Sequence, residues 1–380
     1  MHRLIPAAAL LLAGWSVIGR SGLCRFDQIF ATIDAAGGGP DSLATLVNQD
    51  PANPLVWCAY AESLSLRGEM HKAGDAFDRA VSLGPGMPPV LMRAANFEFT
   101  HERPDRGFLL AARILERTSA FDEILFSYLQ RSGVPCADVF GTAIPAAPRP
   151  ARAWFAWLRT HGSLQDLRDT WRWMKLNGLL DGQSAGEVAW TLWNRKSYAA
   201  AKALWTDWAG QSTNGQLLVN PLFENAPNES PFDWTLGSSP AVSLARSNGL
   251  EIRFAGTENI AFSQVHQFTV LPPGRYRFSA EIQSHALTTD QGLYFHIFDL
   301  VDPRRLDVRT HSILGTAMRS WVSIDFTVPR GTDALAVQLE RRPSDLFDNR
   351  IAGRLHVYRV SLEKSQSLPG PRAASAGPND

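Results

Sequence analysis

The sequence predicts an α-helical repeat solenoid over residues 35–215, followed by an antiparallel β-sandwich of the jelly-roll type over residues 216–364. Two observations predict this division. Apolar residues recur at helical spacing, with a period of about 34 residues, as far as Gly210. Beyond Gly210, short segments rich in β-branched and aromatic residues alternate with Gly, Pro, Asn or Asp.

The composition places the chain in no extreme class. It has 380 residues, 37 basic and 37 acidic side chains and a formal net charge of +0, and 45% of its residues are hydrophobic. Because the chain carries no basic block, we expect no nucleic-acid partner. Cys24, Cys58 and Cys136 lack the paired spacing of a zinc site or a disulfide framework.

The first residues have the pattern of an export signal. Arg3 is followed by an apolar run from Leu4 to Gly19, which is shorter than the roughly 20 residues of a membrane span. We therefore expect residues 1–24 to be a signal peptide or a signal anchor. One alternative is a lipidated Cys24, although Leu23 stands where that signal needs a small residue, and the other is a buried N-terminal helix of a cytosolic protein. Export would place the protein in the periplasm or cell envelope, where only an uncleaved anchor would touch the membrane.

One helical hairpin is clear between Pro54 and Met87. Its small residues would let two antiparallel helices approach closely, its large aromatic residues would fill the gap between them, and a proline would end the second helix. The pattern resembles the tetratricopeptide (TPR) repeat at its signature positions, which are Trp57, Tyr60, Ala61, Gly68, Ala73, Phe77, Ala80 and Pro85. The resemblance implies stacked hairpins with a concave surface that docks a protein partner.

Weaker copies flank this hairpin at the same period and predict four to six hairpins in all. Two arrays are out of phase across the stretch Phe121–Pro150, where residues 143–150 are expected to be a linker or loop. Eight tryptophans lie between residues 154 and 208. We expect them to pack between helices, with an aromatic binding groove as the alternative.

Nine strands are expected after Gly210, and the tail from residue 365 to 380 is expected to be disordered because it has few apolar residues. The expected strands cover residues 216–220, 242–245, 250–254, 267–270, 276–282, 293–300, 321–328, 334–340 and 355–362.

The order of local motifs in this second part resembles the jelly-roll carbohydrate-binding modules attached to many secreted glycoside hydrolases. Asn220–Glu224 opens the domain, Pro273–Phe278 forms a turn entering a strand, Phe326–Pro329 follows, and Leu355–Leu362 is the closing strand. The resemblance implies a sheet face on which aromatic rings stack on sugars while amides, carboxylates and arginines bond the hydroxyl groups.

The candidates for that face are Trp234, Tyr294, His296, Arg309 and Trp321, with Asp290, Gln291 and Asn349 as polar partners. Strand alternation puts Tyr294 and His296 on the same face. The alternative for Trp234 and Trp321 is that both fill the sandwich core. The resemblance also suggests a structural calcium at Glu224, but Arg359 stands where the second calcium-binding Asp is common; Asp348 is a substitute ligand. No other cofactor is expected.

Nothing in the sequence indicates catalysis. It contains no HExxH or GxSxG motif and no phosphate-binding loop. We therefore expect a non-enzymatic envelope protein whose repeats dock a protein and whose sandwich engages an oligosaccharide or polysaccharide, in assembly or export of an extracellular polysaccharide. One alternative is a pure protein-interaction scaffold with a structural sandwich. A second is a glycoside hydrolase, which would need two carboxylates facing each other across a cleft.

Overall fold

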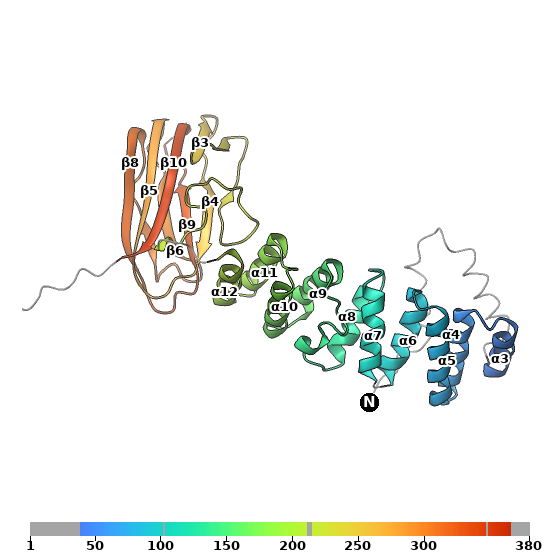
Figure 1. Cartoon of the computed structure of the whole chain (residues 1–380). Coiled ribbons are helices and arrows are strands. Elements are labelled where there is room, and N and C mark those ends of the chain that lie inside the picture. Colours follow the sequence, from blue (N-terminus) through green and yellow to red (C-terminus); the bar gives the residue numbers. More distant parts are fainter. Residues whose placement is uncertain (1–38, 102, 211–214, 347–348, 366–380) are drawn as a thin grey trace, which may run out of the picture. The chain divides into compact units, whose positions relative to one another are not determined.

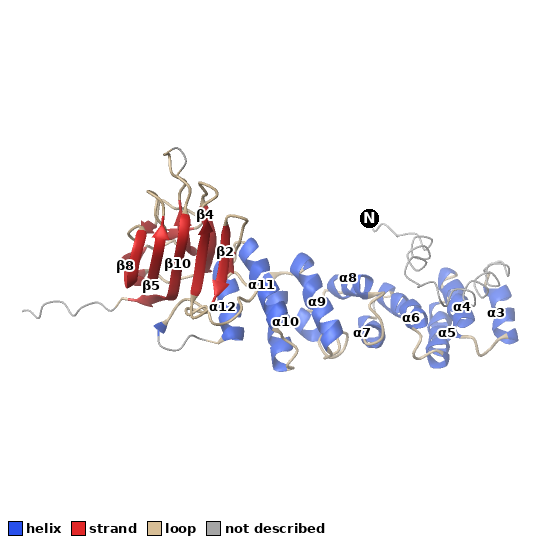
Figure 2. Cartoon of the chain, turned by 90° about the horizontal axis from the view of Figure 1, so that it is seen from above, coloured by secondary structure: helices blue, strands red, loops and turns tan. Residues whose placement is uncertain are grey.

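The computed structural model describes residues 39–101, 103–210, 215–346 and 349–365. In these residues every element up to α12 is helical and every later element is a strand (Figure 2), which confirms the predicted fold class. The predicted signal segment 1–24 and, apart from Ser365, the predicted disordered tail 365–380 lie outside the described residues. None of the described helices is long and apolar enough to cross a membrane.

The chain divides into two compact units, residues 1–180 and 181–380. Helices in the first begin at a regular period: α4, α6 and α8 start 34 residues apart, as do α5 and α7. Proline occupies the first turn of α4, α6, α7 and α9, where a missing N–H costs no hydrogen bond. The elements are α3 (Pro40–Gln49), α4 (Pro54–Leu66), α5 (Met70–Leu83), α6 (Pro88–Thr100), α7 (Pro104–Leu115), α8 (Asp122–Arg131), η1 (Cys136–Val139), α9 (Pro148–His161) and α10 (Leu164–Leu176).

The hairpin α4–α5 is packed through small residues. Ala61, Ala73 and Ala80 are fully buried, and Phe77 contacts Phe97 of α6 with ring centroids 4.9 Å apart. Trp57 and Tyr60 lie half-buried against the same cluster, Gly68 takes a positive φ of 82° in the turn, and Pro85 follows the end of α5.

The 34-residue period is broken after α8. The next hairpin begins with α9, which starts 26 residues after α8 instead of 34. The segment 143–150, expected to be a linker or loop, is irregular as far as Ala147, although Ala143 and Ile144 are fully buried. Pro148–Pro150 instead form the first turn of α9. A short 3₁₀ helix and irregular chain thus replace the second helix of that hairpin.

The second unit begins with the hairpin α11 (Gly182–Asn194) and α12 (Tyr198–Ala209) and continues as two antiparallel five-stranded sheets. The first sheet has the order β1-β4-β9-β6-β7 and the second the order β2-β3-β10-β5-β8, of which Figure 1 shows β8, β5 and β10 side by side. The strands are β1 (Thr235–Leu236), β2 (Val242–Arg246), β3 (Leu250–Ala255), β4 (Phe262–Thr269), β5 (Gly274–Leu287), β6 (Tyr294–Asp299), β7 (Asp307–Arg309), β8 (Gly315–Val328), β9 (Leu335–Arg341) and β10 (Ala352–Lys364).

The prediction of a strand at residues 216–220 is wrong, and two short strands of the structure were not predicted. Residues 216–220 form no strand, because the Gln216 side chain accepts the N–H groups of Leu217, Leu218 and Leu362 in place of a ladder, and Asn220 takes a positive φ of 49°. The missed strands β1 and β7 are edge strands of only two and three residues.

A glycine in β10 provides a test of how closely β5 and β10 approach. Gly353 has a φ of 103°, and a Cβ there would lie 2.2 Å from the carbonyl oxygen of Ala286. We expect Gly353→Ala to lower the free energy of unfolding by more than about 2 kcal/mol, because the cost of the strained backbone conformation adds to the cost of the clash with β5. Gly331→Ala is the control, because it shares a positive φ with no neighbour within 4 Å; an equal loss in both variants, by urea unfolding, would contradict the close approach.

Candidate functional site

The outer face of the second sheet carries a half-exposed indole. Along β8, Val322 and Ile324 turn towards the core, while Trp321 turns outward and keeps 50% of its surface exposed. Strand register sets Trp321 opposite Glu281 of β5, and Glu281 opposite Arg359 of β10. The three side chains therefore form a row across three neighbouring strands.

Charged groups hold this row in place. Glu281 accepts hydrogen bonds from Arg319 Nε at 2.7 Å and Arg359 Nε at 3.0 Å. The Arg359 guanidinium lies 4.9 Å from the Trp321 ring centroid, and that of Arg319 lies 3.9 Å from the Tyr358 ring centroid. We call Trp321, Arg359, Glu281, Arg319 and Tyr358 the Trp321 surface; it presents an exposed ring beside two guanidinium groups that share one carboxylate.

The two arginines change the acidity of the carboxylate. The hydrogen bond from Arg319, helped by its charge and by Arg359, holds the pKa of Glu281 below its ordinary value. A carboxyl group with a lowered pKa in the folded state contributes stability at neutral pH, and this contribution is lost as the pH falls through the folded-state pKa.

We therefore expect Glu281→Gln to destabilise the protein at pH 7 by more than it does at pH 3, measured as urea midpoints across that range. The exposed Glu224→Gln is the control and should show no such pH dependence. A pH-independent difference for Glu281→Gln would contradict the assigned ion pairs.

Three predicted candidates meet on the outer face of the first sheet. The Tyr294 hydroxyl donates to Glu340 Oε1 at 2.9 Å, and His296 Nδ1 lies 2.6 Å from Glu340 Oε2. His296 Nε2 lies 2.9 Å from Asp307 Oδ1, which Arg309 also contacts at 3.1 Å. Each ring nitrogen of His296 therefore lies beside a carboxylate oxygen, one from β9 and one from β7.

This cluster has little surface to offer a ligand. Tyr294 and His296 are each 8% exposed, and the Arg309 guanidinium lies 5.8 Å from the Tyr294 ring centroid. The two rings are therefore engaged by their neighbours in the sheet. The cluster resembles a structural polar network more than a stacking platform.

Trp234 lies in the core, and the prediction that it stacks on a sugar is wrong for this structure. It is 2% exposed and packs against Phe223 with ring centroids 5.0 Å apart. A ring in the interior has no face for a ligand, so the core-filling alternative holds for Trp234 but not for Trp321.

The three predicted polar partners lie in loops. Asn349 donates to Asp290, and the Gln291 N–H donates to Thr289 Oγ1 at 3.0 Å. A buried arginine joins these loops, because Arg341 donates to the same Thr289 oxygen at 3.0 Å. Among the described contacts of Asp290, Gln291 and Asn349, none reaches Tyr294, His296 or Trp321.

The predicted calcium ligands are not brought together in the described part of the chain. Glu224 is exposed, and Asp348 lies outside the described residues. Within the described ranges, no group of three or more His, Cys, Asp or Glu side chains is placed to hold a metal ion.

Sequence reasoning missed most of the Trp321 surface. It gave Glu281 no binding role, and it noted Arg359 only as a departure from a calcium pattern. The available signal was the polar alternation of β5, β8 and β10, but joining it into one row requires the strand register.

No protein-family model matches the sequence, and no curated protein matches it. Solved structures of two kinds are similar to it. TmCBM61, solved with β-1,4-galactotriose, has 15% identity over 40% of this chain and 99% of its own, with a TM-score of 0.28. A CBM4 structure has 15% identity over 39% of this chain and 99% of its own, with a TM-score of 0.27. PilF of Pseudomonas aeruginosa has 14% identity over 50% of this chain and 90% of its own, with a TM-score of 0.25. YrrB, a TPR protein with an unusual peptide-binding site, has 12% identity over 44% of this chain and 90% of its own, with a TM-score of 0.22. The chain thus has neighbours among both carbohydrate-binding modules and TPR proteins, while its fold is established by its own helices and sheets.

Proposed function

We propose that the sandwich binds a glycan at the Trp321 surface. One observation carries this proposal: a half-exposed indole lies beside two guanidinium groups that a shared carboxylate holds in place. The apolar face of a sugar ring stacks on an indole, and its hydroxyl groups accept hydrogen bonds from arginine. Because the arginines are already fixed by Glu281, little side-chain entropy is lost on binding.

The helical repeats would dock a protein partner in the same proposal. This part of the proposal is supported by the stacking of the helices from α4 to α8, in which side chains join successive hairpins. Tyr128 of α8 donates to Asn96 of α6 at 2.5 Å, and Arg93 of α6 lies 3.7 Å from Glu62 of α4. Repeats joined in this way form an extended surface suited to a peptide or another protein.

The wider role rests on the sequence. An apolar N-terminal segment favours export, and the pairing of repeats with a sugar-binding sandwich favours a non-enzymatic, cofactor-independent envelope protein in assembly or export of an extracellular polysaccharide. The burial of Trp234 supports the alternative of a pure protein-interaction scaffold, but that alternative does not explain why Trp321 is exposed. Glu340 and Asp307 do not support a hydrolase, because both carboxylates contact the His296 imidazole instead of facing each other across a cleft.

A polysaccharide panel tests the glycan half of the proposal. The full chain should bind at least one neutral or acidic polysaccharide in isothermal titration, with the same affinity before and after calcium removal. Absence of binding to every polymer, by a protein shown to be folded, would move the assignment to a protein-interaction scaffold.

A further inference from the structure

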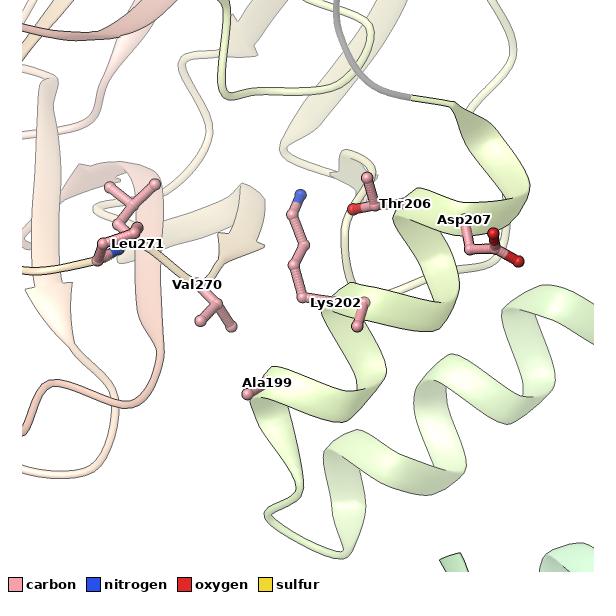
Figure 3. A pocket seen from close by; sticks show the side chains of 8 residues that line it. Ala199, Lys202, Thr206, Asp207, Val270 and Leu271 are labelled. Carbon is pink, nitrogen blue, oxygen red and sulfur yellow. The ribbon is translucent and has the colours of Figure 1, made fainter. Parts of the chain in front are cut away.

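An open pocket of about 740 Å³ lies between α12 and the chain that follows β4, inside the second unit. Its size is within the roughly 300–1,000 Å³ of small-molecule sites. Five of its lining residues are apolar, and one is a lysine whose side chain reaches into the pocket (Figure 3). We call it the Lys202 pocket, and it is lined by Ala199, Lys202, Ala203, Thr206, Asp207, Val270, Leu271 and Pro272.

Aromatic rings pack between the elements that carry the two walls of this pocket. Trp193 of α11 stacks on Phe268 of β4, with ring centroids 5.1 Å apart, and contacts Phe232 edge to face at 5.5 Å. Lys202 lies over the same Phe232 ring, with Nζ 5.0 Å from its centroid. These contacts join the helical hairpin to the sandwich beside the pocket.

The Lys202 ammonium has no anionic partner among the described residues. Burial alone lowers the pKa of Lys202 to about 8, with no carboxylate opposing the shift. Asp207 lines the same pocket, but its side chain points away from Lys202 (Figure 3). A partly buried cation without a counter-charge is unfavourable by itself, and a bound anion would relieve that cost.

We propose that the Lys202 pocket binds a carboxylate attached to an aliphatic body, with the acid group on the ammonium and the body against Val270, Leu271 and Pro272. Five of the eight lining residues are apolar, and Thr206 is the one lining residue with a hydroxyl group. A polyhydroxylated sugar acid would find few hydrogen-bond partners there. This site is separate from the Trp321 surface, and neither proposal depends on the other.

Two sources share this chemistry, a free short-chain acid and a polypeptide C-terminus with an aliphatic last residue. The test titrates the full chain with isovalerate and with the tripeptide Gly-Gly-Leu, each beside its neutral amide. The chain has five lysines, so the Lys202 side-chain signal can be followed by heteronuclear NMR in the same titrations.

We expect at least one of the two acids to bind, its amide to bind at least tenfold more weakly, and the pKa of Lys202 to rise in the complex. Binding of isovalerate alone identifies a free acid, and binding of Gly-Gly-Leu identifies a chain terminus. Affinity should fall as the pH rises above about 8, because the free ammonium loses its proton.

Lys202→Met keeps the apolar stem over Phe232 but removes the charge, and it should weaken binding at least tenfold while melting like the parent protein. Lys196→Met, at an exposed position before α12, is the matched control and should bind normally. Equal binding by Lys202→Met, equal binding of acid and amide, or no binding of either acid would overturn the proposal.

Discussion

Trp234→Ala is expected to lower the free energy of unfolding by about 3–5 kcal/mol, the range for removing a buried aromatic side chain. The ring is 2% exposed and packs in the cluster between the two sheets, so the deletion leaves a cavity that the sheets cannot close. Urea unfolding followed by circular dichroism measures the loss.

Trp234→Phe separates packing from hydrogen bonding. Trp234 Nε1 has no hydrogen-bond partner among the described residues, so phenylalanine removes volume and no hydrogen bond. Its loss should be well under half of the alanine value. A small loss for Trp234→Ala would show that the ring is at the surface and would restore it as a sugar platform.

Trp321→Ala is expected to weaken glycan binding at least tenfold, about 1.4 kcal/mol, while leaving the fold intact. The ring is half-exposed, so its deletion should change the free energy of unfolding by less than about 1 kcal/mol. The measurement is isothermal titration with the polymer that the panel identifies.

Trp208→Ala is the matched control for Trp321→Ala. Trp208 lies in α12, is 37% exposed, and contacts Trp205 of the same helix. It should bind the polymer like the parent protein. Equal losses in the two variants would indicate non-specific stacking on exposed tryptophans.

The contrast between Trp234 and Trp321 shows what the sequence could predict. Around Trp321, the alternation of Val322 and Ile324 with polar residues is a signal for an outward ring, and the structure agrees. Trp234 directly precedes a two-residue strand, so no alternation was available to orient it. The 34-residue period likewise predicted the hairpins and the phase break, because it depends on residues close together in the chain.

Contacts between distant strands were not predictable in the same way. Alternation correctly put Tyr294 and His296 on one face, but their burial depends on Glu340 and Asp307, which come from neighbouring strands. The failed strand at residues 216–220 has a similar cause, since the Gln216 side chain bonds β10, more than a hundred residues later.

Oxidative footprinting of Trp321 with and without bound polysaccharide shows whether a glycan covers the Trp321 surface, because it measures the exposure of one ring in the unmodified protein. We expect saturating polysaccharide to protect Trp321 from hydroxyl-radical labelling at least severalfold and to leave the labelling of Trp208 unchanged. Polysaccharide binding with Trp321 labelled as fast as in the free protein would contradict this expectation and place the glycan elsewhere on the chain.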